Sequence, residues 1–567
     1  MNEEIRTRIT TALKSLYNAK SEILNVHIEI NRTTEKVHGD LYTNIAMKLA
    51  KILKKNPCEI AEDIKDHIPL DDHIIKIESV APGYINFFLS KKNKYDQIDK
   101  ILNCKNDFID KEKDKKNIHV EYVSANPTGP LHIGHGRGMI LGEITARFLA
   151  YQGHKIKREY YVNDAGRQID LLLVSVLLSH IGESAHVFID EKENEDGHML
   201  TYKGNYISNV ASSLSNALSK IDKKSIISLL NEPIDTLIRY LKERNDYLQV
   251  RKLLVDEVID SYIRKDLEAV GINFDSWYNE SELYKNGILD GVFKSIENKN
   301  LSYTKDGALW FKNTQFGDDK DRVLIKTNGD MTYFATDIAY HVHKFKHHDV
   351  LIDIWGADHH DYAQRLQTAL RALGYNVESR LQIHLVQFAN LSKSGQSISM
   401  STRSGKFYPV QDLVNEIGKD ATRFFYLIKR KEQHLDFDID QAGQENKNNP
   451  IYYIQYAHAR ITKILQDLND REISEENYNN LNTKSEIEIL DIFDRYQETI
   501  NKAIYEIRPD LITNYLYKLS KVFHSYYAET KILTENVKGE KIKLLKCIDK
   551  IILDGLEMLD ITPLDSM

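Results

Sequence analysis

The sequence has 567 residues, which is too long for one hydrophobic core, so we expect several domains of roughly 100 to 200 residues each. Hydrophobic residues make up 42% and charged residues 28% of the chain, a balance typical of globular proteins that excludes a disordered or fibrous chain. The formal net charge of -8 argues against a protein that coats nucleic acid indiscriminately, but it leaves room for a local basic groove.

The cysteines and the apolar runs predict a cytoplasmic protein. Cys58, Cys104 and Cys547 lie far apart without CxxC spacing, so we expect reduced thiols rather than a zinc site or a disulfide framework. The first twenty residues have the pattern of an amphipathic helix and lack the apolar centre of a secretory signal. The longest aliphatic run, 171–178, is far shorter than the roughly 20 residues that cross a bilayer, so we expect no membrane role.

The first hundred residues predict a small α+β domain. A helical pattern alternates with the strand-like runs "HIIKIESV" and "YINFFLS", which the turn Pro82-Gly83 separates. The charged run "NDFIDKEKDKKN" follows and is typical of a solvated linker. We therefore expect an N-terminal domain over 1–111.

A parallel sheet is expected next. The strand-like "NIHVEYVSA", a helical pattern that ends at Gly153 and the strand-like "HKIKREYYVN" form a βαβ unit. The polar segment 181–202 predicts a loop or insertion, and we expect insertions over about 181–290. The runs "DRVLIKTNGDMTYFATDIAYHVHKF", "VLIDIWGADHH", "DYAQRLQTALRALG" and "LQIHLVQF" predict the second half of the same sheet, in a domain over 112–447.

Strand signals end near Asn448. The segments "PIYYIQYAHARITKILQDL", "LITNYLYKLSKVFHSYYAETKIL" and "IKLLKCIDKIILDGLEML" all have the apolar spacing of amphipathic helices. We expect an α-helical domain over 448–567.

The stretch "NPTGPLHIGHGRG" carries the first candidate site. Ligands of an open α/β sheet bind beyond the carboxyl ends of the strands, where a helix start presents free amides and a positive dipole end. Gly134 and Gly136 would let a base or a triphosphate approach the backbone, and His132 and His135 share one face of the first turn. A metal site would need further ligands, and packing would not explain two histidines among so many glycines, so phosphate binding is the favoured interpretation.

These residues resemble a known family. "HIGH" after a first strand is the signature of class I aminoacyl-tRNA synthetases, and "SANPTGPLHIGHGRG" is similar to its arginyl-tRNA synthetase form. "YYVNDAGRQI" and "YKGNYI" resemble the next blocks of that family, and "GDLYTNIAMKLAK" and "APGYINFFL" resemble its N-terminal domain, which is implicated in contacts near the tRNA elbow. The resemblance covers nearly the whole chain. It implies a class I, Rossmann-type catalytic domain between an α+β domain and an α-helical anticodon-binding domain.

The resemblance also implies a reaction. ATP and L-arginine would give arginyl-adenylate, and the arginyl group would pass to the 3′-terminal adenosine of tRNA(Arg), with release of AMP and diphosphate. Mg²⁺ would arrive with ATP, and activation would require bound tRNA. In this family the HIGH residues bind ATP and stabilise charge on the α-phosphate, so His132 and His135 are expected to be catalytic. The expected ATP-binding residues are Ala125, Asn126, Pro127, Thr128, Gly129, Pro130, Leu131, His132, Ile133, Gly134 and His135.

An arginine pocket needs planar, anionic and hydrogen-accepting walls. Tyr333 and Asp337 are spaced i, i+4, which puts both on one face of a helix. "WGADHHDY" could be taken for a metal cluster, but the resemblance assigns it to substrate and adenosine contacts without a metal ligand. The arginine-binding residues that the resemblance implies are Asn126, Asp164, Tyr333, Asp337 and His360.

The second class I signature, KMSKS, is altered. Its register is "SISMSTRSGKF", so the loop positions are Ser399, Met400, Ser401, Thr402, Arg403 and Ser404. Ser399 and Thr402 replace both lysines, and a hydroxyl cannot supply the charge that an ammonium gives the leaving diphosphate. Candidates for that charge are Arg403, Lys406 and Lys393, and Arg403 is our first choice because it lies within the loop.

The segments 452–461 and 523–533 resemble the anticodon-binding domain, whose aromatic and basic side chains suit stacking on unpaired bases. A tyrosine stripe at helical spacing also fits a core, and we expect most of these rings to be buried. We expect a monomer. The alternatives are another class I synthetase or HxGH nucleotidyl transferase, and an inactive tRNA-binding paralogue.

Overall fold

The computed structural model describes residues 2–17, 21–33, 35–104, 109, 111–188, 200–398, 407–468, 472–474, 478–533 and 536–567. The chain divides into two compact units. The first comprises Met1–Lys105, Asp470–Tyr496 and Ser525–Lys550, and the second comprises Asn106–Asn469, Gln497–His524 and Ile551–Met567. No helix in the described ranges is long and apolar enough to cross a bilayer.

The first unit contains an antiparallel sheet of order β1-β2-β4-β3, with β1 Asn31–Arg32, β2 Leu41–Thr43, β3 Ile74–Val80 and β4 Tyr84–Leu89. The helices of its N-terminal part are α1 Asn2–Leu16, α2 Ser21–Leu24, α3 Ile45–Leu53, α4 Pro57–Asp66 and α5 Lys91–Asn103. α4 shows why such a helix starts where it does: Pro57 occupies its first turn, and the side chain of Asn56 accepts a hydrogen bond from the amide of Cys58. The predicted α+β domain and its β3–β4 hairpin are confirmed.

Two short strands also belong to this unit. β16 Glu472–Ser474 and β17 Asn536–Lys538 pair in parallel. The expectation of helices alone beyond Asn448 is therefore wrong at these two places. Each strand has only three residues, which is too short to show an alternating pattern.

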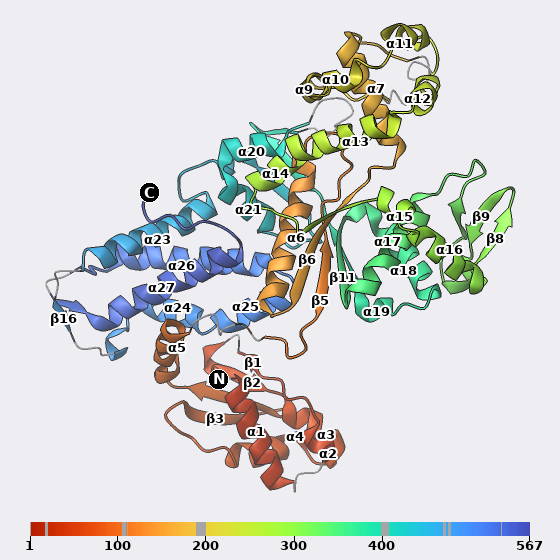
Figure 1. Ribbon diagram of the computed structural model, residues 1–567. Coiled ribbons are helices and arrows are strands. Elements are labelled where there is room, and N and C mark those ends of the chain that lie inside the picture. Colours follow the sequence, from red (N-terminus) through yellow and green to blue (C-terminus); the bar gives the residue numbers. More distant parts are fainter. Residues whose placement is uncertain are drawn as a thin grey trace. The chain divides into compact units, whose positions relative to one another are not determined.

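The second unit is built on a five-stranded parallel sheet of order β12-β11-β5-β6-β7 (Figure 1). Its strands are β5 Asn117–Glu121, β6 Lys155–Val162, β7 Ser276–Asn279, β11 Val350–Gly356 and β12 Leu381–Val386. The predicted βαβ unit and parallel sheet are confirmed. Sequence reasoning missed β7, which lies inside the region 181–290 that was expected to be an insertion.

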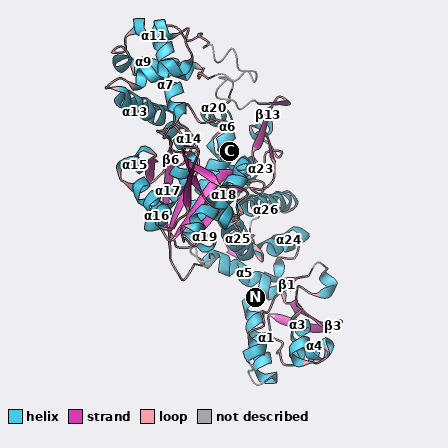
Figure 2. Ribbon diagram, turned by 90° about the vertical axis from the view of Figure 1, so that its right-hand side faces the viewer, coloured by secondary structure: helices cyan, strands magenta, loops and turns pink. Residues whose placement is uncertain are grey.

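Helices cover both faces of this sheet (Figure 2). Successive side chains of a strand point to opposite faces. Near the end of β5, Glu121 accepts a hydrogen bond from Lys344 of α17 (Tyr333–His347) at 2.8 Å, whereas Tyr122 donates to Glu143 of α6 (Ile133–Tyr151) at 2.8 Å. α6 and α17 therefore lie on opposite faces, as in a doubly wound fold.

Two insertions extend from the sheet. The first contains the helices α7 Arg167–Ile181, α9 Asn205–Ser213, α10 Ser215–Leu218, α11 Lys223–Leu229, α12 Ile234–Lys242, α13 Tyr247–Val258 and α14 Arg264–Ala269. The second contains α15 Ser281–Lys285, α16 Ile288–Asn298 and an antiparallel sheet of β8 Ser302–Lys305, β9 Ala308–Phe311 and β10 Arg322–Ile325. The run "DRVLIK" was expected in the parallel sheet, and this is wrong, because β10 pairs with β9 instead.

After β12 the chain forms a small sheet and then helices. β13 Ala389–Lys393 pairs with β14 Gln396–Ser397 and, in parallel, with β15 Leu435–Asp438. The helices of this part are α20 Val410–Ile417, α21 Lys419–Leu427 and α22 Ile439–Ala442, whereas α18 His360–Ala372 and α19 Val377–Arg380 connect β11 to β12. The final helices are α23 Pro450–Gln466, α24 Lys484–Phe493, α25 Tyr496–Tyr505, α26 Pro509–Glu529 and α27 Gly539–Met558, which confirms the predicted helical end of the chain.

Candidate active site

The connections of the sheet reverse direction between β5 and β11, because the chain continues outward from β5 to β6 and from β11 to β12. Ligands of open α/β sheets bind beyond the carboxyl ends of the strands at such a point. Two cavities lie there, and Val123, just beyond β5, lines both of them. The histidine cavity, of about 380 Å³, is lined by Val123–Asn126, Thr128–His132, His135, Gln168, Tyr202 and His359.

His132 and His135 cap the first turn of α6. Nδ1 of His132 accepts a hydrogen bond from the amide of Gly134 at 3.1 Å, and Nδ1 of His135 accepts one from the amide of His132 at 3.2 Å. A nitrogen that accepts carries no proton, so in both neutral rings the proton lies on Nε2. Each histidine therefore keeps one N–H donor for a ligand.

Burial keeps these rings uncharged. It lowers the pKa of His132 to about 4, and burial together with the neighbouring His132 lowers that of His135 to about 3. At neutral pH the site offers two oriented neutral donors at the positive end of a helix, rather than two imidazolium cations.

The turn before α6 is strained and held by several contacts. Val123 and Ser124 have φ angles of 67° and 41°, a region that β-branched residues such as valine seldom adopt. The hydroxyl of Ser124 donates to Glu121 at 3.0 Å and accepts from the amide of Tyr161 at 3.1 Å, and the hydroxyl of Tyr160 donates to the carbonyl of Ala125 at 2.8 Å. Strain of this kind persists where the surroundings fix it, and it concentrates at functional sites.

The second cavity, which we call the tryptophan cavity, has a volume of about 210 Å³. It lies over the ends of β11 and β12 and the first turn of α6, and its lining includes Gly134, Gly138, Trp355, Gln387 and Phe388. Trp355 and Phe388 supply flat apolar faces, and the glycines leave backbone exposed, which suits a planar heterocycle.

Gly136 has a different role from the one expected. A Cβ at this position would lie 2.4 Å from the ring of Tyr426, whose hydroxyl donates to the carbonyl of Ile133 at 2.8 Å. Gly136 therefore allows α21 to pack on α6, and the expectation that it admits a ligand is wrong. Within α6, Gly134 and Gly138 line the tryptophan cavity, whereas Gly136 does not.

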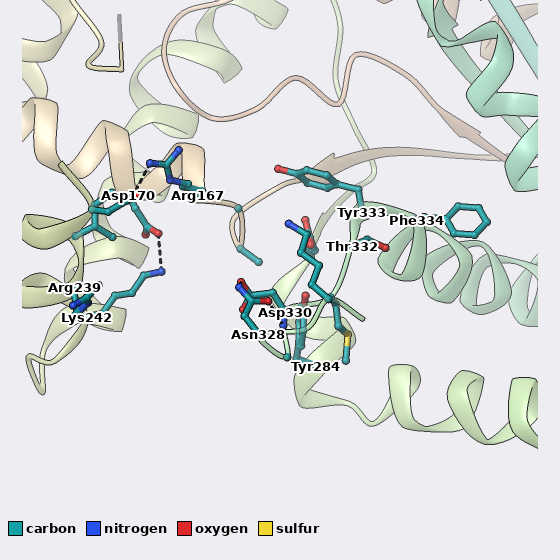
Figure 3. Close-up of a pocket in the computed structure, with 18 residues that line it drawn as sticks. Arg167, Asp170, Arg239, Lys242, Tyr284, Asn328, Asp330, Thr332, Tyr333 and Phe334 are labelled. Carbon is teal, nitrogen blue, oxygen red and sulfur yellow. Dashed lines mark hydrogen bonds and ion pairs between the residues drawn. The ribbon is translucent and has the colours of Figure 1, made fainter. Parts of the chain in front are cut away.

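A third cavity, the large cavity, measures about 1090 Å³ and is shown in Figure 3. Tyr333, 55% exposed, borders it, and Arg239 and Lys242 of α12 lie across from that ring (Figure 3). Part of the positive charge that lines this cavity is paired with acidic side chains. Lys242 contacts Asp170 at 3.2 Å, and Arg167, which also lines the cavity, contacts Asp235 at 2.7 Å. The cavity has room for a polar group much larger than an amino acid.

Buried carboxylates gather beside Tyr333. Asp337 accepts a hydrogen bond from the hydroxyl of Tyr362, and burial raises the pKa of Asp337 above its usual value. Glu280 lines the large cavity and is only 4% exposed, and its Oε2 has no hydrogen-bond partner among the described residues. Burial, followed by the charges of Asp337 and Asp164, raises the pKa of Glu280 to about 7. Acids that are buried together favour a cationic ligand, because a cation relieves their repulsion.

Known families match these parts in order. The model of the arginyl tRNA synthetase N-terminal domain matches residues 3–89, that of the catalytic domain of class I tRNA synthetases (R) matches residues 97–468, and that of the DALR anticodon binding domain matches residues 454–567. An arginine–tRNA ligase from Hydrogenovibrio crunogenus is 38% identical, over 95% of this chain and 95% of its own length. Another from Coxiella burnetii is 38% identical over 100% of both chains. The chain belongs to the arginyl-tRNA synthetase family.

The fold agrees with that of solved arginyl-tRNA synthetases. The structure of Thermus thermophilus arginyl-tRNA synthetase matches with a TM-score of 0.70 over 100% of both chains, at 19% sequence identity. At that identity the match shows a shared fold.

In this member of the arginyl-tRNA synthetase family, most of the expected ATP-binding residues surround the two smaller cavities. Those in the histidine cavity are Ala125, Asn126, Thr128, Gly129, Pro130, Leu131, His132 and His135. Gly134 faces the tryptophan cavity, whereas Pro127 and Ile133 line neither.

The structure does not bring all the residues expected to bind arginine together. Asn126 lines the histidine cavity, Tyr333 borders the large cavity, and Asp337 lies one helical turn after Tyr333. Asp164 accepts a hydrogen bond from the amide of Ser281 at 2.8 Å. The side chain of His360 is 71% exposed and pairs with Asp361, so the structure does not bring it to the others.

The altered KMSKS loop, Ser399 to Ser404 with Arg403, lies outside the described residues, as does Lys406. Its flanks are defined. The amides of Ile133 and Val410 donate to the carbonyls of Tyr408 and Leu131, both at 3.0 Å, so the chain after the loop pairs with the HIGH segment. Lys393 contacts Glu416 at 2.8 Å, outside the residues that line the three cavities.

Sequence reasoning missed three residues of the site, Glu121, Glu280 and Tyr362. Glu121 had a usable signal, since it ends β5 just before the HIGH segment. Tyr362 stands in the first turn of α18, but no spacing rule joins it to Asp337 on α17. Glu280 follows the four-residue strand β7, which has no pattern strong enough to predict it.

Proposed function

We propose that this chain activates L-arginine with ATP and transfers the arginyl group to the 3′-terminal adenosine of tRNA(Arg), releasing AMP and diphosphate. The observation that carries this proposal is the pair of neutral histidine donors at the start of α6. The acids beside Tyr333, whose pKa values are raised by burial, support it. Class I family membership supports ATP use. We place the adenine in the tryptophan cavity and the phosphates in the histidine cavity.

The histidines stabilise the transition state of activation. As the carboxylate of arginine attacks the α-phosphorus, negative charge builds on the equatorial oxygens. The Nε2–H groups of His132 and His135 donate to those oxygens, and the amides of the first turn of α6 add their dipoles. Their orientation is fixed before the substrate arrives, because both Nδ1 atoms are bonded to the backbone. No proton has to leave either ring.

The buried acids select the amino acid. We assign the guanidinium to Asp337, Glu280 and the face of Tyr333, with Asn126 and Asp164 as further walls. A planar guanidinium presents five N–H donors in a fork, and it satisfies two carboxylates better than an ammonium does. His360 stays a proposed contact, which would require its exposed side chain to turn inward on binding.

The charge on the leaving diphosphate is assigned to Arg403. The ion pair of Lys393 with Glu416 and the hydrogen bond of Tyr408 to the same carboxylate support this choice over Lys393. Mg²⁺ would enter with ATP, because it binds mainly through substrate phosphates, and would neutralise part of their charge.

The remaining assignments concern the whole protein. We propose domains over 1–111, 112–447 with insertions at about 181–290, and 448–567. The matches of the N-terminal, catalytic and anticodon-binding family models support them. We further propose that the chain acts as a monomer in the cytoplasm, with the first and last domains contacting tRNA.

One assay tests the activity. Exchange of labelled diphosphate into ATP is measured with a panel of amino acids, with and without tRNA. Exchange with arginine, dependent on tRNA, is expected. Exchange with another amino acid would assign the chain to a different class I activity, and no exchange under any condition would favour an inactive tRNA-binding paralogue.

A further inference from the structure

The guanidinium of Arg137, the fifth residue of α6, donates hydrogen bonds to four backbone carbonyls. Nη1 donates to the carbonyls of Gln387 at 2.9 Å and Gln433 at 2.6 Å, and Nη2 donates to those of Arg430 at 2.7 Å and Lys429 at 3.4 Å. The residue is 3% exposed. Four of its five N–H donors are therefore committed to the main chain.

The four carbonyls come from two separate segments that begin paired strands. Gln387 stands between β12 and β13, and Gln433 stands just before β15. β13 and β15 pair in parallel from Ala389 and Leu435 onward. One side chain of the HIGH helix thus fixes the starts of both strands, and β13 leads through β14 toward the KMSKS-like loop.

Arg137 is poorly placed to bind phosphate itself. A positive charge beside the HIGH histidines suggests phosphate binding. However, the N–H groups of the guanidinium already donate to backbone carbonyls, and the side chain is buried. Burial lowers the pKa of Arg137 to about 10, so the group stays charged at neutral pH and its charge is compensated by carbonyl dipoles.

The same contacts set one wall of the tryptophan cavity. Arg137 lines that cavity together with Gln387, whose carbonyl it holds, and with Phe388, the next residue along. The position of Phe388 relative to Gly134 and Gly138 on α6 therefore depends on this contact. Small displacements of a binding wall cost large factors in a reaction that requires alignment.

We infer that Arg137 is a positioning residue, which sets the width of the nucleotide cavity by clamping the 387–388 and 429–433 segments to the HIGH helix. The inference rests on the proposed binding of ATP in this cavity. It predicts an effect on ATP that is separate from any effect on arginine.

The chain supplies a matched control. The guanidinium of Arg380 also donates hydrogen bonds to backbone carbonyls, those of Asp349 at 2.9 Å, Phe345 at 2.9 Å and His348 at 2.7 Å. It stands just before β12, whereas Gln387 follows the other end of that strand. Arg380 has the same chemistry as Arg137 but lines none of the three cavities.

The experiment compares Arg137→Gln, Arg137→Lys and Arg380→Gln with the unaltered chain. ATP affinity is measured by titration calorimetry, KM for ATP and for arginine by diphosphate exchange, and Tm by calorimetric unfolding. We expect Arg137→Gln to weaken ATP binding and raise KM for ATP by roughly tenfold or more, with KM for arginine within about twofold. Arg137→Lys should recover only part of the loss, because an ammonium cannot reproduce the fork. Arg380→Gln should lower Tm without changing ATP affinity.

Two results would overturn the inference. If Arg137→Gln and Arg380→Gln lower Tm alike and neither changes ATP affinity, Arg137 is only structural. If Arg137→Lys restores ATP affinity fully, a positive charge is sufficient and the clamp is not needed. Should Arg137→Gln fail to fold, Arg137→Lys decides between these outcomes. Loss of ATP affinity in the variants, with no arginine-dependent exchange even in the unaltered chain, would refute the proposed function and leave the positioning role standing.

Discussion

At the scale of single residues, each HIGH histidine has two tasks, one for each ring nitrogen. Nδ1 completes the helix cap, and Nε2 is left to donate to a ligand. A change to alanine removes both functions together, so loss of activity in such a variant would not reveal which function mattered. Asparagine separates them, because its carbonyl oxygen can accept the amide at a helix N-cap but does not extend to the cavity.

We predict that His132→Asn keeps Tm close to that of the unaltered chain and lowers the rate of arginine-dependent exchange by about 10² to 10³, the usual cost of one preorganised donor. His132→Ala should show the same kinetic loss and also lose about 1 kcal/mol of stability with the cap. Exchange rates and thermal unfolding measure the two effects. A near-normal exchange rate in His132→Asn would show that Nε2 has no catalytic role.

We predict that Glu280 makes arginine binding depend on pH. With its pKa raised to about 7, the free enzyme gains a full negative charge on this carboxyl as the pH rises through 7. KM for arginine should fall as the pH increases from about 6 to 8, because the ionised carboxylate binds the guanidinium better. Glu280→Gln should raise KM and remove this slope, and Glu297→Gln, on the exposed face of α16, should leave both unchanged.

The same shift affects stability with a defined sign. Between the ordinary pKa of Glu280 near 4.5 and its folded value of about 7, the native state binds more protons than the unfolded state. The free energy of unfolding therefore falls as the pH rises through this window. Glu280→Gln should make that decline shallower in urea unfolding at several pH values. An unchanged decline would mean that the carboxyl titrates normally.

At the scale of elements, α6 carries contacts to the catalytic cavities on one side and to α21 on another. Gly136 and Gly138 lie two residues apart on this helix, yet an added methyl meets Tyr426 at 2.4 Å in the first case and nothing within 4 Å in the second. The glycines of the motif are thus not interchangeable. Gly136 sets the spacing between α6 and α21, and Gly138 borders the tryptophan cavity.

We predict opposite stability changes for two alanine substitutions. Gly136→Ala should cost about 1 to 3 kcal/mol, because the hydroxyl of Tyr426 is bonded to Ile133 and its ring cannot easily move. Gly138→Ala should raise the free energy of unfolding by about 0.5 to 1 kcal/mol, because alanine is more stable than glycine inside a helix. Its added methyl group, which faces the tryptophan cavity, should raise KM for ATP. Denaturant unfolding and exchange kinetics measure both. Equal destabilisation by the two variants would contradict this account of α6.

Elements with strong patterns could be predicted from the sequence, and short ones could not. The βαβ unit around the HIGH helix could be predicted because β5, α6 and β6 are long enough to show the spacing of apolar residues typical of strands and helices. β7 and β10 have four residues each, and their sheet partners depend on tertiary contacts that no local pattern records.

The candidate site was predictable where a motif fixed the backbone. His132 and His135 lie at a helix start, as the pattern indicated. In "GADHH" the sequence could not tell which polar side chain borders a cavity. The backbone of the single-turn helix Ala357–His359 sets the directions of these side chains. His359 lines the two smaller cavities, and His360 is exposed to solvent.

At the scale of the whole molecule, the last residues of the chain are tied to the catalytic domain within the second unit. Asp560 contacts Lys419 at 3.1 Å and both Arg147 and Arg423 at 3.5 Å. Arg423 is fully buried and also donates to the carbonyls of Leu559 and Val270. The segment after α27 therefore contributes to the stability of the domain that holds α6 and α21.

We predict that Asp560→Asn lowers the free energy of unfolding of this unit by about 1 to 3 kcal/mol, since it leaves the buried Arg423 without its carboxylate. Asp565→Asn, in the same segment but with a side chain 85% exposed, should change it by less than about 0.5 kcal/mol. Calorimetric unfolding compares the two variants. Similar Tm values for both would show that the Asp560 contacts contribute little.

The backbone pairing between the HIGH segment and Tyr408–Val410 bears on which side chains the KMSKS-like loop can carry. The chain is anchored before the KMSKS-like loop by Ile398, whose amide donates to Leu391 at 2.9 Å, and after it by the pairing with Leu131 and Ile133. The hydrogen bonds that fix the two flanks are made by main-chain groups outside the loop, so they do not depend on which side chains stand at positions 399 and 402. We therefore expect Ser399→Lys and Thr402→Lys to leave both anchors in place, and thermal unfolding of the double variant would check this.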